Sequence, residues 1–146
     1  MNKILNHLKT VSWFFIFPVF VLITHVVLLF LFNIYEVFPW FDIPMHFVGG
    51  VSLGITYFLI LQFSQKENYL KINSFFKVLF IFALVSLTAV FWELFEFSAE
   101  LISGLNLQGS LEDTMLDLFL GMFGGLFAAI FLESQAKRYF KSKQSL

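Results

Sequence analysis

The segment FKVLFIFALVSLTAVFWELFEFSAELI, residues 76–102, decides the fold class of this chain. It is longer than the roughly 20 residues with which a helix crosses about 30 Å of bilayer hydrocarbon. Its one basic residue, Lys77, lies at its start, whereas its acids, Glu93, Glu96 and Glu100, lie in its second half. We therefore expect a membrane-spanning helix, and the acids within it need a physical explanation.

The composition of the whole chain agrees with a membrane location. The 146 residues are 59% hydrophobic and 13% charged, and they include 23 Phe, whereas an ordinary soluble domain is about 25% charged. The chain has no cysteine, which excludes disulfides, thiolate metal sites and cysteine nucleophiles. We expect a single all-α integral membrane domain over residues 1–146.

Four apolar runs are long enough to span a membrane. The first is too long for the apolar region of a signal peptide, and no cleavage pattern follows it, so we expect it to be retained. Short connections place consecutive helices side by side, which predicts an antiparallel bundle of four transmembrane helices. The expected spans are about 11–34, 43–63, 76–102 and 111–132.

The charged residues are distributed unequally between the two ends of this bundle. Four antiparallel spans place all nine basic residues on one side, which the positive-inside rule assigns to the cytoplasm. We therefore expect both termini inside a bacterial cytoplasmic (plasma) membrane, and the lipid bilayer rather than nucleic acid as the main partner. Eight of the ten acids map to the outer loops or outer halves of spans: Glu36, Asp42, Glu93, Glu96, Glu100, Glu112, Asp113 and Asp117.

The polar residues of the outer halves fall into pairs that share a helix face. Side chains three or four residues apart stack on one side of a helix, and ionisable groups inside spans usually face the bundle interior and pair with one another. We therefore expect one histidine–carboxylate cluster below the outer surface. The pairs are Asp42 with His46, Glu93 with Glu96, and Asp113 with Asp117.

Some of these residues have simpler explanations. Asp42 precedes Pro44 in the order typical of a helix N-cap. Asp113 follows Ser110 at the spacing of a capping box, and Glu100 is placed to reach water at a helix end.

The other histidines also have alternatives, whereas two acids do not. For His25, in mid-span, we favour an interhelical hydrogen bond over a site role, and we expect His7 at the surface. Neither Glu93 nor Asp117 stands at a helix end, and each would cost about 2–3 kcal/mol or more if it faced lipid. These two acids are therefore the strongest candidates for functional residues.

Glycines recur at a spacing of four in two spans. Gly50 and Gly54 follow His46, and Gly121 and Gly125 follow Asp117. Small residues at this spacing let membrane helices approach closely. We expect the second and fourth spans to touch just below the cluster, and glycine-rich faces also provide a route to a homo-oligomer.

Three motifs together resemble a known family. They are DIPMHFVGG (residues 42–50), FWELFEF (residues 91–97) and EDTMLDLFLGMFGG (residues 112–125). Their order and spacing resemble the YjdF-like family of bacterial inner-membrane proteins and, more distantly, the VanZ-like family. The resemblance covers roughly residues 41–125 and implies no particular activity. It implies that the family's polar positions are Asp42, His46, Glu93, Glu96, Asp113 and Asp117.

The first functional hypothesis is an enzyme that acts at the outer leaflet. A histidine with several carboxylates can hold a divalent metal, here Zn, Mn or Fe, or perform acid–base chemistry without one. Such a protein would be a metal-dependent membrane hydrolase or transferase acting on a lipid or lipid-linked substrate. The catalytic candidates are His46, Glu93, Glu96 and Asp117, and the candidate metal ligands are these four with Asp42 and Asp113.

Two other functions fit the same residues. A buried polar network serves a structural or accessory protein if it only fixes the register of helices. Intramembrane acids also mark cation and proton pathways, which favours a transporter. The sequence leaves these alternatives open, together with the substrate, the metal and the oligomeric state.

Overall fold

A computed structural model describes residues 2–104 and 107–144. All regular structure in these residues is helical. The elements are α1 (Asn2–Phe14), α2 (Ile16–Phe32), α3 (Ile34–Val37), the 3-10 helix η1 (Pro39–Phe41), α4 (Asp42–Lys66), α5 (Ser74–Ser103) and α6 (Leu111–Gln144).

Three helical segments are long and apolar enough to cross a membrane. They are Pro39–Lys66, Ser74–Ser103 and Leu111–Lys143, and they contain the spans expected at 43–63, 76–102 and 111–132. The bent pair of α1 and α2 would supply a fourth. Large apolar side chains in mid-helix point outward, and Phe30, Phe91 and Phe119 are each about 60% exposed. Outward-facing side chains of this kind are expected to contact lipid.

The first apolar run is not one straight helix. The helix is interrupted at Phe15, and the two flanking helices meet at an angle of 44°. Pro18 explains the position of this break, because proline has no N–H and its ring clashes with the carbonyl of the residue four positions earlier, Phe14. The Phe14 carbonyl oxygen instead lies 2.9 Å from the Thr56 hydroxyl on α4. The broken turn is thus attached to the next long helix.

Capping residues fix the ends of the long helices near the loops. The Asn73 side chain accepts a hydrogen bond from the backbone N–H of Phe76 and begins α5. Gly104 ends α5 with φ of 72°, a conformation that glycine adopts without steric cost. Ser110 Oγ accepts the N–H of Asp113 at the start of α6. These caps set which residues of α5 and α6 lie level with the first turns of α4.

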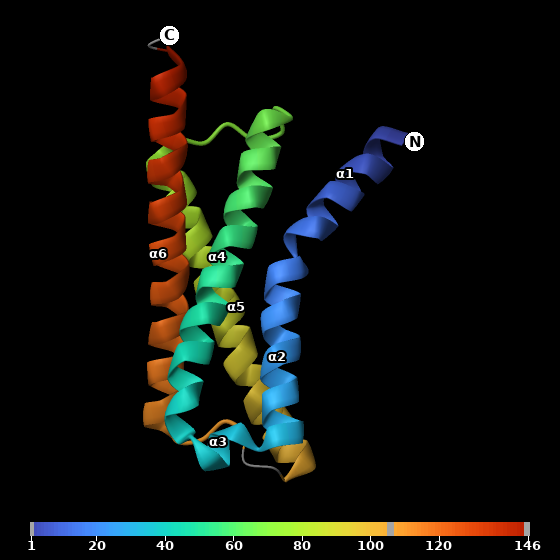
Figure 1. The fold of residues 1–146 in the computed structure, drawn as a ribbon, viewed down its shortest axis with the longest axis vertical. Coiled ribbons are helices and arrows are strands. Elements are labelled where there is room, and N and C mark those ends of the chain that lie inside the picture. Colours follow the sequence, from blue (N-terminus) through green and yellow to red (C-terminus); the bar gives the residue numbers. More distant parts are fainter. Residues whose placement is uncertain (1, 105–106, 145–146) are drawn as a thin grey trace.

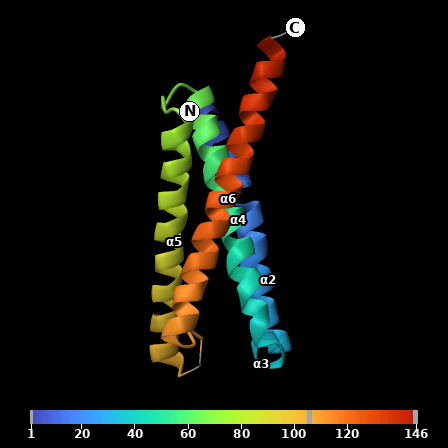
Figure 2. The same cartoon turned by 90° about the vertical axis from the view of Figure 1, so that its left-hand side faces the viewer.

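α4 lies at the centre of the molecule and contacts α2, α5 and α6. Figure 1 shows α2, α4, α5 and α6 side by side, with both chain ends at the same end of the molecule. The turned view in Figure 2 shows α6 crossing α4: α6 starts beside α5 at the lower end and reaches the far side of α4 at the upper end. The loops around α3 and residue 107 lie at the opposite end from the termini, and we call it the loop end.

Glycines allow α6 to cross α4 closely, as the sequence predicts. A Cβ atom added to Gly50 would collide with the backbone of Gly121. One added to Gly54 would lie 2.8 Å from the carbonyl oxygen of Gly125. The predicted contact between the second and fourth spans is confirmed. These four glycines are used within the chain, and the homo-oligomer stays a prediction.

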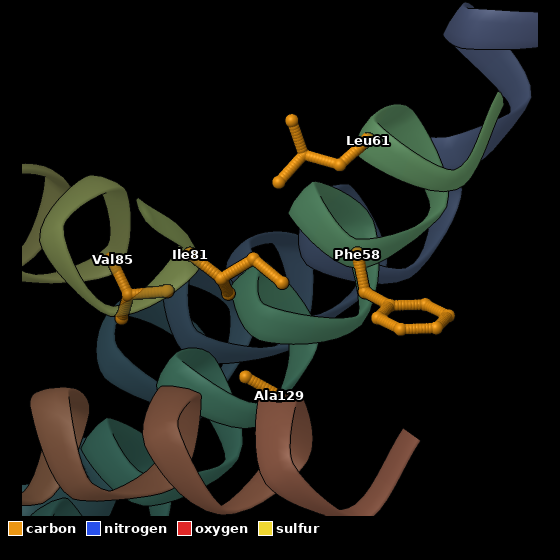
Figure 3. Packing of buried hydrophobic residues seen from close by; sticks show 5 residues of the cluster. All are labelled: Phe58, Leu61, Ile81, Val85 and Ala129. Atoms are coloured by element: carbon orange, nitrogen blue, oxygen red, sulfur yellow. The ribbon is translucent and has the colours of Figure 1, made fainter. Parts of the chain in front are cut away.

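The apolar core lies toward the terminal end of the bundle. Figure 3 shows its five buried side chains meeting from three helices. Because these side chains fill the centre there, the interior polar groups of the loop end are separated from the terminal end by an apolar layer. The five are Phe58, Leu61, Ile81, Val85 and Ala129.

Candidate functional site

Three helices bring polar side chains together near the loop end. Asp42 and His46 occupy the first two turns of α4, Glu93 and Glu96 lie in the last third of α5, and Asp117 lies in the second turn of α6. Each pair shares a face because its members are three or four residues apart. We call these five residues the histidine–carboxylate cluster.

The His46 ring is the centre of the cluster. Its Nε2 atom lies 3.4 Å from Asp42 Oδ1 and 3.8 Å from Asp117 Oδ1, and its Nδ1 atom lies 4.0 Å from Glu93 Oε1. Exposure of Glu93, Glu96 and Asp117 is 5%, 8% and 3%. The ring therefore lies between the carboxylates of Asp42 and Asp117 at Nε2 and the carboxylate of Glu93 at Nδ1.

Two overlapping sets of atoms are close enough to share a metal ion. They are Asp42, His46 and Asp117, and His46, Glu93 and Glu96, with ligand atoms within 4.8 Å of one another in each set. Zinc ligands about 2.1 Å from the ion lie about 3.4 Å apart in a tetrahedral arrangement. The distances from Nε2 to Asp42 and Asp117, 3.4 and 3.8 Å, are nearer to this value than the 4.0 Å from Nδ1 to Glu93. The set of Asp42, His46 and Asp117 therefore fits an ion more closely.

The cluster has more negative than positive groups. Among the described residues, no Lys or Arg forms an ion pair with its four carboxyl groups. Glu93 Oε2 is buried and has no hydrogen-bond partner, an arrangement that costs free energy unless a proton or a cation compensates it. The buried hydroxyl of Thr114, a residue that sequence reasoning missed, lies beside Glu93. A bound cation would remove this imbalance.

The other candidates from the sequence lie at the edge of the cluster or outside it. Asp113 is exposed and belongs to neither metal-compatible set, and its N–H bond to Ser110 supports the capping alternative. Asp42 is the first residue of α4, whose N-cap is Phe41, and its carboxylate lies beside His46. Glu100 Oε2 accepts the N–H groups of Leu107 and Gln108, at 2.9 and 3.0 Å. Glu100 therefore organises the loop before α6.

The two remaining histidines have separate environments. His25 on α2 stands edge-on to Trp92 on α5, with ring centroids 5.5 Å apart. His7 lies in a partly exposed position, where its Nε2 is 3.3 Å from Glu67 and its Nδ1 is 3.1 Å from the Tyr69 hydroxyl. These contacts attach α1 to the end of α4, and no local sequence pattern predicts them.

A second buried polar group lies at the terminal end. Lys77, which stands at the start of the third expected span, is 2% exposed. Its Nζ atom forms an ion pair with Glu133 at 3.1 Å, although the alignment falls short of a hydrogen bond. It also contacts Gln62 Oε1 and lies 4.3 Å from the centre of the Phe58 ring. Sequence reasoning missed this site because Lys77 stands at the end of an apolar run.

The long apolar helices, with most large side chains facing outward, define a helical membrane protein. The chain belongs to the family described as Predicted membrane protein (DUF2238), which matches residues 4–138. No curated protein and no solved structure matches the chain. The family description gives a membrane location and no chemistry, so any function has to be argued from the site itself.

Proposed function

We propose that this protein is an integral membrane enzyme whose histidine–carboxylate cluster holds a divalent metal ion and acts on a lipid or lipid-linked substrate. The observation that carries the proposal is the position of His46 Nε2, between Asp42 Oδ1 at 3.4 Å and Asp117 Oδ1 at 3.8 Å. Nitrogen and carboxylate ligands suit Zn, Mn or Fe. Three protein ligands would leave further coordination positions for water or substrate.

The two nitrogens of His46 would have different roles. With the ion on Nε2, the Nδ1–H group faces Glu93 at 4.0 Å, which is the usual place for a carboxylate that orients a metal-binding imidazole. Glu93 Oε2 stays unpaired and, with Glu96, would accept or donate a proton during the reaction. The ion would polarise a substrate oxygen and activate a water molecule. This division of roles fits a hydrolase or a transferase.

The membrane arrangement that we propose has four spans. The bent pair of α1 and α2 counts as the first, neighbouring spans are antiparallel, and both termini face the cytoplasm of a bacterium. Support comes from the gathering of the basic residues at the terminal end and from the common position of the two chain ends (Figure 1). The cluster would then open toward the outer leaflet, where no basic side chain is at hand to hold a phosphate group, and the metal would take that role.

The apolar layer favours an enzyme over a cation pathway. The buried side chains of Phe58, Ile81 and Val85 fill the interior between the cluster and the terminal end. An ion crossing the bundle needs a continuous series of polar groups. Within the described residues, the buried polar side chains between the cluster and the Lys77–Glu133 pair are those of Ser52 and Thr56, whose hydroxyls donate to backbone carbonyls. No buried carboxylate or histidine in this described part of the chain joins the two ends.

Elemental analysis of the detergent-purified full chain tests the proposal. After chelation and reloading with Zn, Mn or Fe(II), we expect stoichiometric metal in the unsubstituted protein and large losses in Asp117→Asn and His46→Gln. Glu112→Gln, which changes an exposed acid on the same helix, is the matched control and should keep the metal. Glu93→Gln should weaken binding by about 10- to 100-fold, as orienting partners do.

Two results would contradict the proposal. Folded protein that takes up none of the three metals would exclude a metal site, and unchanged folding of Glu93→Gln would then leave the cluster without a role in either chemistry or stability. If Glu96→Gln loses the metal and Asp117→Asn keeps it, the ion belongs on Nδ1 and the division of roles proposed for His46 is wrong.

A further inference from the structure

A mostly apolar cavity adjoins the histidine–carboxylate cluster on the side of α2. It has a volume of about 270 Å³ and is lined by residues of α2, α4 and α5, together with Gly121 of α6. An engineered apolar cavity of about 150 Å³ is already large enough to bind benzene. The space beside the cluster is therefore large enough for part of an organic ligand.

The cavity is elongated along the helices and has one polar end. Its lining on α4 runs from Met45 to Leu53, and on α5 from Trp92 to Val85. Seven residues of helix correspond to about 10 Å. His25 and His46 line the end near the cluster, and the rest of the wall is largely aliphatic. A ligand that fits would have a polar group at the histidines and an apolar chain below it.

The walls explain why the space stays open. α4 contacts both α2 and α5, whereas α2 and α5 meet mainly through the His25–Trp92 ring contact. Gly49 leaves room on the central helix, since a Cβ atom added there would find no neighbouring atom within 4 Å. On α2, Val19 and Leu22 line the cavity and are 48% and 43% exposed. These half-exposed residues place the mouth of the cavity at the lipid-facing side of α2.

We propose that this cavity binds one long apolar chain of a membrane lipid, entering sideways past α2, and so holds the lipid's polar group beside His46. The chemistry shared by the candidate ligands is a polar head on an acyl or isoprenoid chain. The inference rests on the proposed function for the identity of the reacting group, whereas occupation of the cavity by a chain does not depend on a metal.

Photo-crosslinking tests the proposal with two separate probes. The full chain is reconstituted in vesicles that contain either a phosphatidylglycerol with a diazirine on one acyl chain or an isoprenyl phosphate with a diazirine on its chain. We expect adducts on cavity residues such as Met45, Leu53 and Trp92 in excess over the outward-facing Phe119. An excess with the first probe assigns an acyl chain, and an excess with the second assigns an isoprenoid.

Two pairs of variants separate the cavity from the general lipid surface. Gly49→Phe fills the cavity from α4 and should lower the cavity adducts by about tenfold, whereas Val48→Phe, at an exposed position outside the lining, should leave them unchanged. On α2, Leu22→Trp fills the cavity, and Ile23→Trp, at an exposed position outside the lining, is its control. This second pair keeps the test decisive if Gly49→Phe fails to fold.

The outcomes for the cavity and for the metal are distinguishable. Asp117→Asn should lose the metal and keep the cavity adducts, while Gly49→Phe should do the reverse. Adducts spread evenly over cavity and outward-facing residues with both probes, or unaffected by both filling variants, would overturn the proposal. Loss of metal binding throughout, with cavity adducts intact, would overturn only the proposed function.

Discussion

The Nε2 atom of His46 on α4 and the Oδ1 atom of Asp117 on α6 lie 3.8 Å apart, and their side chains are 11% and 4% exposed. This pair connects two helices directly above the glycine contact of Gly50 with Gly121. The glycine packing and the polar cluster therefore both depend on the crossing of α4 and α6. Substitutions at the glycines and at the cluster can perturb each of them separately.

A divalent metal should stabilise the folded protein through this pair. A ligand that binds only the folded state at 100 times its dissociation constant adds about 2.7 kcal/mol to the free energy of unfolding. The measurement is the midpoint of thermal unfolding in detergent, followed by circular dichroism, with and without Zn, Mn or Fe(II). Asp117→Asn should abolish the increase and Glu112→Gln should keep it. An equal increase in Asp117→Asn would show that the metal binds elsewhere.

Gly50→Ala should destabilise the protein, because the new methyl group meets the backbone of Gly121. Overpacking of this kind costs about 1–3 kcal/mol. The matched control is the adjacent Gly49→Ala, which has free space and should be neutral or slightly stabilising, since alanine favours helix by up to about 1 kcal/mol over glycine. Unfolding in mixed micelles measures both free energies. Equal effects at the two positions would contradict the crossing described above.

Lys77→Met should destabilise the terminal end by leaving the Glu133 carboxylate buried without its partner. Removing one member of a buried ion pair costs about 3–5 kcal/mol, whereas replacing both members by apolar residues is often neutral. The double variant Lys77→Met/Glu133→Leu should therefore recover most of the loss. Lys71→Met, at an exposed loop position, is the control and should stay within about 0.5 kcal/mol. A double variant as unstable as the single one would argue against the pair.

Thr56→Val should loosen α1 and α2 from α4, because the Thr56 hydroxyl donates to the Phe14 carbonyl oxygen at 2.9 Å. The same hydroxyl lies 2.8 Å from the Ser52 carbonyl oxygen, and its one proton serves one acceptor at a time. Interhelical hydrogen bonds in membranes contribute about 0.6 kcal/mol on average. With Pro18→Ala, which restores an N–H for Phe14, the Thr56→Val effect should shrink. Additive effects in this double-mutant cycle would contradict the link.

Single introduced cysteines should report the proposed membrane orientation, because the chain has none of its own. Glu112→Cys at the loop end should react with a membrane-impermeant thiol reagent in intact cells. Lys71→Cys, in the loop between α4 and α5, should react only after the membrane is opened. The reverse pattern would place the cluster on the cytoplasmic side and invert the proposed topology.

Much of the fold follows from local patterns. The apolar runs at 43–63, 76–102 and 111–132 predict three helices that the structure contains, and glycine spacing predicts the contact between α4 and α6. Helical periodicity also predicts which acids share a face, and the structure brings His46, Glu93, Glu96 and Asp117 together with Asp42. The chemical roles of these residues stay predictions.

Other features depend on contacts between distant residues. The helix is interrupted at Phe15, three residues before Pro18, because the proline leaves the carbonyl of Phe14 without its helical partner. The Thr56 hydroxyl donates a hydrogen bond to this carbonyl. His7, at a partly exposed position, contacts Glu67 and Tyr69, which are about 60 residues away in the sequence. Asp113 belongs to a helix cap and lies outside the metal-compatible sets. The contacts of Phe14 with Thr56 and of His7 with Glu67 and Tyr69 join residues far apart in the sequence. The effect of Pro18 on Phe14 and the cap of Asp113 by Ser110 are local.

The sequence by itself determined that the chain is a set of long apolar helices with eight of its ten acids toward one end, because hydrophobic length and helical periodicity are local properties. Only the tertiary structure decided which nitrogen of His46 faces which carboxylate, that Lys77 is buried against Glu133, and that a cavity lies beside the cluster. These features depend on the rotation and crossing of whole helices. Close glycine contacts and side-chain packing fix that geometry, and both exist only once the helices have assembled.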